Sequence, residues 1–180
     1  METIVQREYD KDKHLKLIKN NIKNKERSDY TILIGYQVFY ERREEILNLC
    51  TEFLEMKIDI FTFCRSFMNL VNTISTFSND ICTNCEKLEQ FQINPQFMNM
   101  DNFRVKVNCI SHTVDDFYYL YLYEDFYEDD AEPFLGCPNL FVLIREYSYE
   151  LIPFYKDIKT FVDSEIKKDT PQSLEKPKNE

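Results

Sequence analysis

Glycine and alanine are scarce in this sequence, and tryptophan is missing. Its 180 residues include two glycines, Gly35 and Gly136, one alanine, Ala131, and no tryptophan. Successive strands of a sheet need many short connections, which commonly contain Gly or Asn-Gly, and no such signal appears. Two isolated glycines also cannot build a glycine-rich phosphate loop. The sequence therefore argues against a sheet-rich fold and favours long helices joined by few loops.

Long apolar runs are also missing. No stretch approaches the roughly 18 apolar residues of a membrane span, and charged residues follow Met1 where a secretory signal would be apolar. The six cysteines could form three disulfides, but a single domain with 43% hydrophobic residues does not need them, so we expect reduced thiols. We expect a soluble intracellular protein without membrane contact. Its composition, rich in Ile, Asn, Lys, Phe and Tyr, is typical of AT-rich genes and suggests a bacterial cytoplasm or a plastid stroma.

Basic side chains are fewer than acidic ones in this sequence. The formal net charge is −10, and residues 1–30 carry eight basic and six acidic side chains, so the acidic excess belongs to the rest of the chain. Nucleic-acid binding depends on Lys and Arg side chains that displace counterions from phosphates. We therefore expect no direct nucleic-acid binding, and a basic protein as the partner of any acidic surface.

Apolar residues recur at helical spacing in three long stretches. Steps of three and four residues predict amphipathic helices at 34–56, 60–90 and 102–127. Asp59 can cap the second of these helices by accepting hydrogen bonds from backbone amides at its start. Ser78 and Asn79 mark a weak point inside the same helix.

Proline shapes the last part of the helical region. Pro138 suits the first turn of a further helix, and Pro153 predicts a kink or a division into helices at 138–151 and 154–167. We expect an all-α fold, an antiparallel bundle of four main helices within residues 31–167 whose last helix is kinked at Pro153. Residues 1–30 predict a charged, partly mobile arm with a short helix, and the polar residues 168–180 predict a disordered tail.

One recognised cysteine motif is present, the CxxC sequence Cys82-Thr83-Asn84-Cys85. Zinc needs about four ligands, and Cys109 and His112, three residues apart on a predicted helix, could complete a Cys3His set. A redox pair belongs at a helix N-terminus after a strand, whereas these cysteines lie late in a predicted helix. We therefore favour two small core residues, one of them with an exposed thiol.

Catalytic arrangements are not recognisable. Neither His14 nor His112 lies in a recognisable setting with a nucleophile and an orienting acid. A solvated acidic run does not separate the pKa values of paired carboxylates, as acid and base catalysis requires. We expect a non-enzymatic protein with no catalytic residue, no metal and no cofactor.

Residues 115–132 carry eight acidic side chains and five tyrosines, with no Lys, Arg or His. The predicted helix 102–127 ends in this stretch, where each exposed acid opposes the helix dipole by about 0.3 to 1 kcal/mol. Local stability therefore does not explain the acids, which leaves a solvated face or a docking surface for a basic protein. The docking interpretation assigns partner binding to Tyr123, Glu124, Asp125, Tyr127, Glu128, Asp129, Asp130 and Glu132.

Two further stretches carry a family resemblance. The chain reads Phe39-Tyr40-Glu41-Arg42 and later Phe53-Leu54, then Lys57-Ile58, then Ile60-Phe61-Thr62-Phe63. A helix ending in Phe-Leu, a short Lys-Ile turn and a helix opening with spaced phenylalanines resembles the small immunity proteins that neutralise colicin D-type, transfer-RNA-cleaving toxins. The resemblance implies a non-catalytic inhibitor whose acidic surface occupies the basic groove of a nuclease, with carboxylates standing in for phosphates.

We therefore expect an acidic binding protein of the immunity type, which docks a basic protein such as a nuclease. The alternative is a structural or accessory subunit of a plastid assembly, which would use an exposed aromatic face. A redox or metal role of Cys82 and Cys85 is the third hypothesis.

Overall fold

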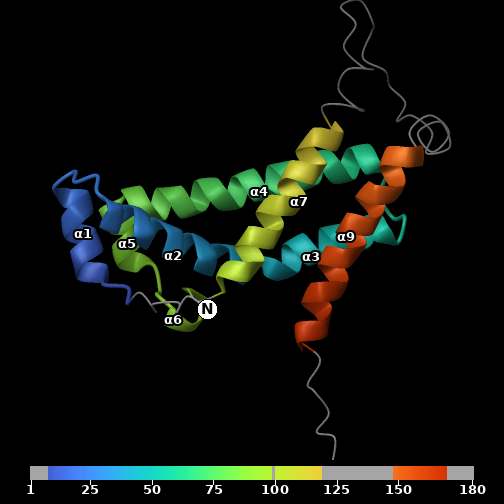
Figure 1. Cartoon of the computed structure of the whole chain (residues 1–180). Helices are drawn as coiled ribbons and strands as arrows, with labels where there is room; N and C mark the ends of the chain where they lie inside the picture. Colours follow the sequence, from blue (N-terminus) through green and yellow to red (C-terminus); the bar gives the residue numbers. More distant parts are fainter. Residues whose placement is uncertain (1–7, 99, 119–147, 170–180) are drawn as a thin grey trace, which may run out of the picture.

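A computed structural model describes residues 8–98, 100–118 and 148–169 of the chain. All regular structure in these ranges is helical, which confirms the prediction of an all-α fold (Figure 1). The helices are α1 (Lys11–Lys19), α2 (Lys25–Glu41), α3 (Arg43–Leu54), α4 (Ile60–Thr83), α5 (Cys85–Gln90), α6 (Pro95–Met98), α7 (Asp101–Phe117) and α9 (Ser148–Asp169).

A long helical hairpin forms the body of the molecule. Helices α2 and α3 follow each other almost without interruption and run back along α4 (Figure 1). The hairpin turn ends at Asp59, whose carboxylate accepts a 2.8 Å hydrogen bond from the backbone amide of Thr62. The predicted cap at Asp59 is therefore confirmed.

Two of the expected helices are each divided at a single residue. The stretch predicted as 34–56 forms α2 and α3, which meet at Arg42, and α2 begins earlier because the Asn24 side chain caps it. The stretch predicted as 60–90 forms α4 and α5, which meet at Asn84. The Asn84 side chain accepts hydrogen bonds from the amides of Glu86 and Lys87, at 2.9 and 3.2 Å, so it starts a new helix. The described residues therefore form eight helices in place of the expected four main ones.

The break near Ser78 and Asn79 does not occur. Helix α4 continues through both residues, and Ser78 is buried. A serine inside a helix has a modest propensity cost, well under 1 kcal/mol, which the burial of Ile74 and Ile81 on the same face exceeds.

Pro153 lies inside α9, which continues through it as one helix from Ser148 to Asp169. Of the two expectations, the division into helices at 138–151 and 154–167 is therefore wrong, and the kink at Pro153 stays a prediction. A proline in a helix interior costs about 3 kcal/mol. Burial of Phe154, Ile158 and the later apolar residues offsets this cost, because each contributes about 1.5 to 3 kcal/mol. Residues 138–147 of the predicted helix 138–151 and residues 170–180 of the predicted tail lie outside the described residues.

The N-terminal helix packs against the body. His14 and Leu17 on α1 are buried, and α1 contacts both α5 and the start of α2. Helix α2 crosses the boundary that the sequence analysis drew at residue 30 between the arm and the bundle. The side chain of Gln37, fully buried on α2, holds the connection after α5 by donating to Gln92 O at 2.7 Å and accepting from the Asn94 amide at 2.9 Å.

Gly35 leaves room on α2 for the side chain of Arg104, which comes from α7. A Cβ atom at this position would overlap the guanidinium of Arg104, which lies over the rings of Tyr36 and Phe39 at 5.8 and 5.5 Å. Such cation–π contacts contribute about 0.5 to 2 kcal/mol. Gly35 is therefore needed at this position to accommodate the Arg104 side chain of α7.

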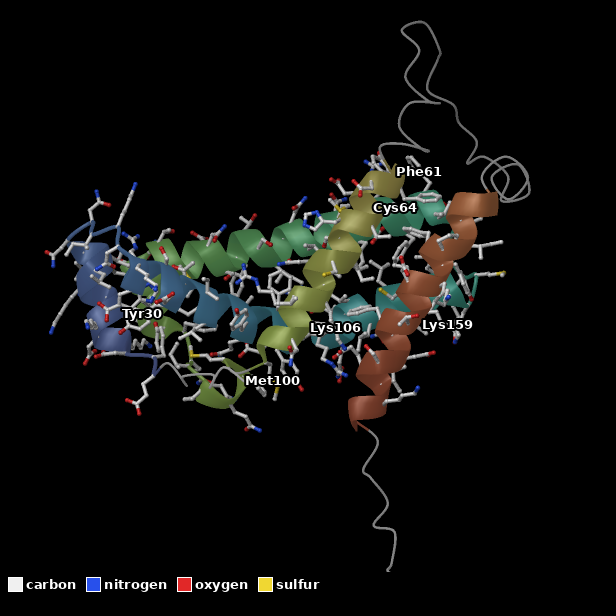
Figure 2. All side chains as sticks on the ribbon, viewed as in Figure 1. Tyr30, Phe61, Cys64, Met100, Lys106 and Lys159 are labelled. Atoms are coloured by element: carbon white, nitrogen blue, oxygen red, sulfur yellow. The ribbon has the colours of Figure 1, made fainter. Side chains whose placement is uncertain are left out.

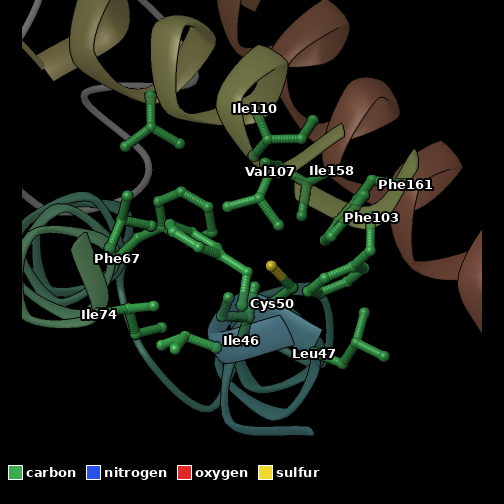
Figure 3. Close-up of a cluster of buried hydrophobic side chains, with 14 of the residues drawn as sticks. Ile46, Leu47, Cys50, Phe67, Ile74, Phe103, Val107, Ile110, Ile158 and Phe161 are labelled. Atoms are coloured by element: carbon green, nitrogen blue, oxygen red, sulfur yellow. The ribbon is translucent and has the colours of Figure 1, made fainter. Parts of the chain in front are cut away.

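The core is one contiguous cluster that links the hairpin to α7 and α9. Figure 3 shows Ile46, Cys50 and Phe67 of the hairpin facing Val107 of α7 and Ile158 of α9. All five are fully buried. The hairpin alone leaves this apolar face uncovered, so α7 and α9 are needed to complete the core.

Candidate functional site

The residues predicted to bind a partner lie outside the described residues. These are Tyr123, Glu124, Asp125, Tyr127, Glu128, Asp129, Asp130 and Glu132. The start of the acidic stretch is described, with Asp115 half-buried and Asp116 exposed on the last turn of α7. The segment 119–147 contains seven acidic residues and one basic residue, a net charge of −6 out of the −10 of the chain.

The two helices that flank this segment, α7 and α9, meet in an aromatic contact. At its start, the ring of Phe117 lies 4.5 Å from Phe154 of α9, and Tyr118 lies 5.9 Å from Phe61 of α4. At its end, Leu151 is half-buried and Phe154 is 2% exposed. Phe117 and Phe154 thus belong to the same cluster, so the C-terminal end of α7 lies beside the N-terminal half of α9 (Figure 1).

A buried ion cluster joins α3, α7 and α9. Glu165 on α9 is fully buried, and its carboxylate lies 2.7 Å from Lys106 Nζ and 3.5 Å from Arg43 Nε. Arg43 also donates to the Glu165 carbonyl oxygen at 2.7 Å, and Lys106 donates to Ser164 Oγ at 2.8 Å. Lys106 lies between α7 and α9 (Figure 2). Because one carboxylate holds two cations, the cluster joins three helices.

This ion cluster could not be predicted from the sequence, because Lys106 and Arg43 are 59 and 122 residues from Glu165 along the chain. One signal was present. Glu165 lies on the apolar face of α9 with Ile158, Phe161 and Val162, where an isolated carboxylate would be costly. An acidic residue on the apolar face of a helix predicts a buried cationic partner, but it does not indicate which Lys or Arg that partner is.

His14 lies in an aromatic environment at the opposite end of the body. It is fully buried, its Nδ1 lies 3.0 Å from the Tyr9 hydroxyl, and the Tyr30 ring lies 5.4 Å away. Burial, with a smaller contribution from the charge of Arg27, lowers the pKa of His14 to about 4. The imidazole is therefore neutral at pH 7 and acts as a core residue.

The cysteines of the CxxC motif lie on either side of the helix break at Asn84. Cys82 is buried, and burial raises the pKa of its thiol to about 11, whereas Cys85 is half-buried at the start of α5. Cys109 and His112 are exposed on α7. Within ranges 8–98, 100–118 and 148–169, no three His, Cys, Asp or Glu side chains come together as a metal site would require. The Cys3His set is therefore not assembled.

Comparisons with other proteins give no family assignment: no protein-family model, no curated protein and no solved structure matches the chain. Of the helices in the described ranges, none combines the length and apolar character that a membrane crossing needs. The resemblance to immunity proteins therefore stays a hypothesis based on the residues quoted for it.

The first prediction concerns the ion cluster. Glu165→Gln removes the charge but keeps the shape, and leaves Arg43 and Lys106 without their carboxylate. We expect the free energy of unfolding to fall by about 3 kcal/mol, as for other broken buried pairs. Chemical denaturation measures the loss. Asp163→Asn, on the exposed side of the same helix, is the matched control and should cost less than about 1 kcal/mol. Equal losses for the two variants would contradict the assignment.

The second prediction concerns His14. Because its pKa is lowered from 6.5 to about 4, the unfolded state binds more protons between these two pH values. Its contribution to stability is complete above about pH 6.5 and is lost as the pH falls toward 4. In His14→Asn, the unfolding free energy should therefore change less steeply with pH across this window. His112→Asn is the matched control for removing an imidazole, and an unchanged slope in His14→Asn would refute a neutral buried His14.

Proposed function

We propose that the protein is a non-catalytic binding protein that docks a basic protein through the acidic, tyrosine-rich residues Tyr123, Glu124, Asp125, Tyr127, Glu128, Asp129, Asp130 and Glu132. The observation that carries the proposal is the segregation of charge. Segment 119–147 has a net charge of −6, while the described residues, with 18 basic and 22 acidic side chains, are close to balance.

The packing of the flanking helices supports the proposal. Phe117 and Phe154, on the helices before and after the segment, pack together at 4.5 Å, so these two helices are already joined before a partner binds. Dense negative charge accelerates association with a basic partner, and tyrosine is enriched among residues that dominate binding energy. Both properties are needed by an inhibitor that must reach its target quickly.

The kind of partner follows from the immunity-protein resemblance. A nuclease presents a basic groove to its phosphate substrate, and a row of carboxylates can occupy that groove. The proposed activity is thus inhibition by occupation of a substrate groove. It requires no metal, no cofactor and no catalytic side chain of this chain.

An accessory subunit of a plastid assembly is the second candidate. It is supported by the exposure of Met56 and Ile152, at 74% and 68%, which a fixed neighbour could cover. Exposed apolar side chains are common on monomers, so this support is weaker than the charge segregation.

The third prediction tests the acidic segment with the partner that the full chain retains from its native source. The variant Glu128→Ser/Asp129→Ser/Asp130→Ser should lower the association rate constant by about tenfold or more at low salt and flatten its salt dependence. Stopped-flow mixing at several salt concentrations measures both quantities.

The matched control removes the same charge elsewhere. Glu44, Glu52 and Asp157 are exposed on α3 and α9, and their joint replacement by Ser should change the rate constant much less. Equal effects of the two triple variants would show that only the net charge of the protein matters and not the position of the acidic segment. An unchanged association rate constant in the first variant would contradict the proposal.

A further inference from the structure

Helix α4 carries almost no charge. Its 24 residues include two charged ones, Arg65 and Asp80, whereas the 22 residues of α9 include nine. The helix forms one long edge of the body (Figure 1), and exposed, uncharged polar side chains line its outer face. Depletion of charge is typical of the centre of a protein interface. We call this face the α4 strip and define it by Thr62, Arg65, Asn69, Asn72, Thr73, Thr76, Asn79, Asp80 and Thr83.

The packing of the fold makes little use of the strip. The side-chain amides of Asn69, Asn72 and Asn79 form no hydrogen bond with a residue in the described ranges. Arg65 is exposed and forms no ion pair with a residue that the structure describes. Because an amide both donates and accepts hydrogen bonds, a surface of this kind can pair with a second copy of itself.

Two copies of the strip are complementary when the helices run antiparallel. A twofold axis near the middle of α4, between Asn72 and Thr73, places residues at equal distances from the axis opposite one another. Steps of three and four residues keep the members of the strip on one face of the helix. In this register the uncharged side chains meet across the contact: Asn72 faces Thr73, Asn69 faces Thr76, and Thr62 faces Thr83 of the second copy.

The two charges of α4 select the same register. Arg65 and Asp80 lie at equal distances from the axis, so the arginine of each copy meets the aspartate of the other. Asp80 also pairs with Lys87, but a carboxylate has about four acceptor sites and can bind both cations. Parallel helices would place arginine on arginine and aspartate on aspartate, which is unfavourable. Charge complementarity therefore favours an antiparallel copy.

A second copy also fits this face better than a strongly charged partner does. The strip contains one positive and one negative side chain, so a very basic or very acidic protein would find no complement on it. Each copy has a net charge of −10, so two copies repel one another over most of their surfaces. Contact along the neutral strip keeps the other charges apart, and physiological salt screens charges beyond about 8 Å.

An apolar contact lies at the border of the strip. Phe77 is 49% exposed, and Leu70, two turns earlier on the same side of α4, is half-buried. The antiparallel register brings Phe77 of each copy within about 3 Å of Leu70 of the other, measured along the helix axis. Helix α4 is about 36 Å long, and one helix face on each copy is a small interface, below about 1,200 Å² in total. We therefore expect a weak, reversible dimer.

We propose that the α4 strip binds the same strip of a second copy, so that two chains form an antiparallel dimer with two ion pairs between Arg65 and Asp80. All residues of this contact belong to α4. The acidic, tyrosine-rich residues are not part of it, so the dimer does not depend on the proposed function.

Sedimentation equilibrium of the full chain tests this proposal, and is the fourth prediction. We expect a monomer–dimer equilibrium at protein concentrations up to about 1 mM. Arg65→Asp and Asp80→Arg should each raise the dissociation constant by about tenfold or more, because each places two like-charged pairs in the contact. Lys156→Asp and Asp157→Arg, with the same changes of net charge at exposed positions of α9, should change it less than about threefold. A monomer at all concentrations, or equal effects of the strip and control variants, would overturn the proposal.

Mixing the two strip variants provides a sharper test. In a mixed dimer of Arg65→Asp with Asp80→Arg, one chain supplies both carboxylates and the other supplies both guanidinium groups, so both ion pairs are restored. The mixed dimer should form with about the dissociation constant of the unmodified dimer, although each variant alone self-associates poorly. The double variant Arg65→Asp/Asp80→Arg should recover self-association for the same reason. No gain on mixing, and no recovery in the double variant, would contradict the antiparallel pairing.

Discussion

The aromatic contact between α4, α7 and α9 is the constraint on which the rest of the structure depends. Phe63 of α4 stacks on Phe53 of α3 at 4.4 Å, and Phe154 of α9 lies 6.1 Å from Phe63 and 4.5 Å from Phe117 of α7. Aromatic pairs at such distances contribute about 0.5 to 1.5 kcal/mol beyond their buried area. The hairpin, the crossing helix and the last helix meet here.

Two polar arrangements fix the geometry that the aromatic rings leave adjustable. The Tyr155 hydroxyl donates to the Leu54 carbonyl oxygen at 2.9 Å, which satisfies the C-terminal end of α3. Further along α9, Glu165 binds cations from α3 and α7. Apolar packing alone tolerates rotation of a helix about its axis, whereas a buried carboxylate with two partners accepts one register. These contacts explain how α9 contains Pro153 and still docks as a single helix.

The sequence predicted the helical class and the cap at Asp59, because periodic apolar residues and a local side-chain cap depend on neighbours in the chain. It did not predict the breaks at Arg42 and Asn84, since both flanking stretches continue the same apolar period. Nor did it predict the Glu165 cluster or the burial of His14, whose partners come from other helices. The acidic site was recognised as a charge pattern alone. Phe117 and Phe154, on the two helices that flank it, are 37 residues apart along the chain, so their contact could not be inferred from the sequence.

Native-state hydrogen exchange tests the central claim most directly, that one aromatic contact unites the hairpin, α7 and α9. If it does, backbone amides near Phe63, Val114 and Ile158 open in a single cooperative unit, with one free energy and one dependence on denaturant. Phe117→Ala should then lower that free energy for all three groups together. Exchange of the α9 amides in a separate unit, unaffected by Phe117→Ala, would show that α9 docks independently and would contradict this account.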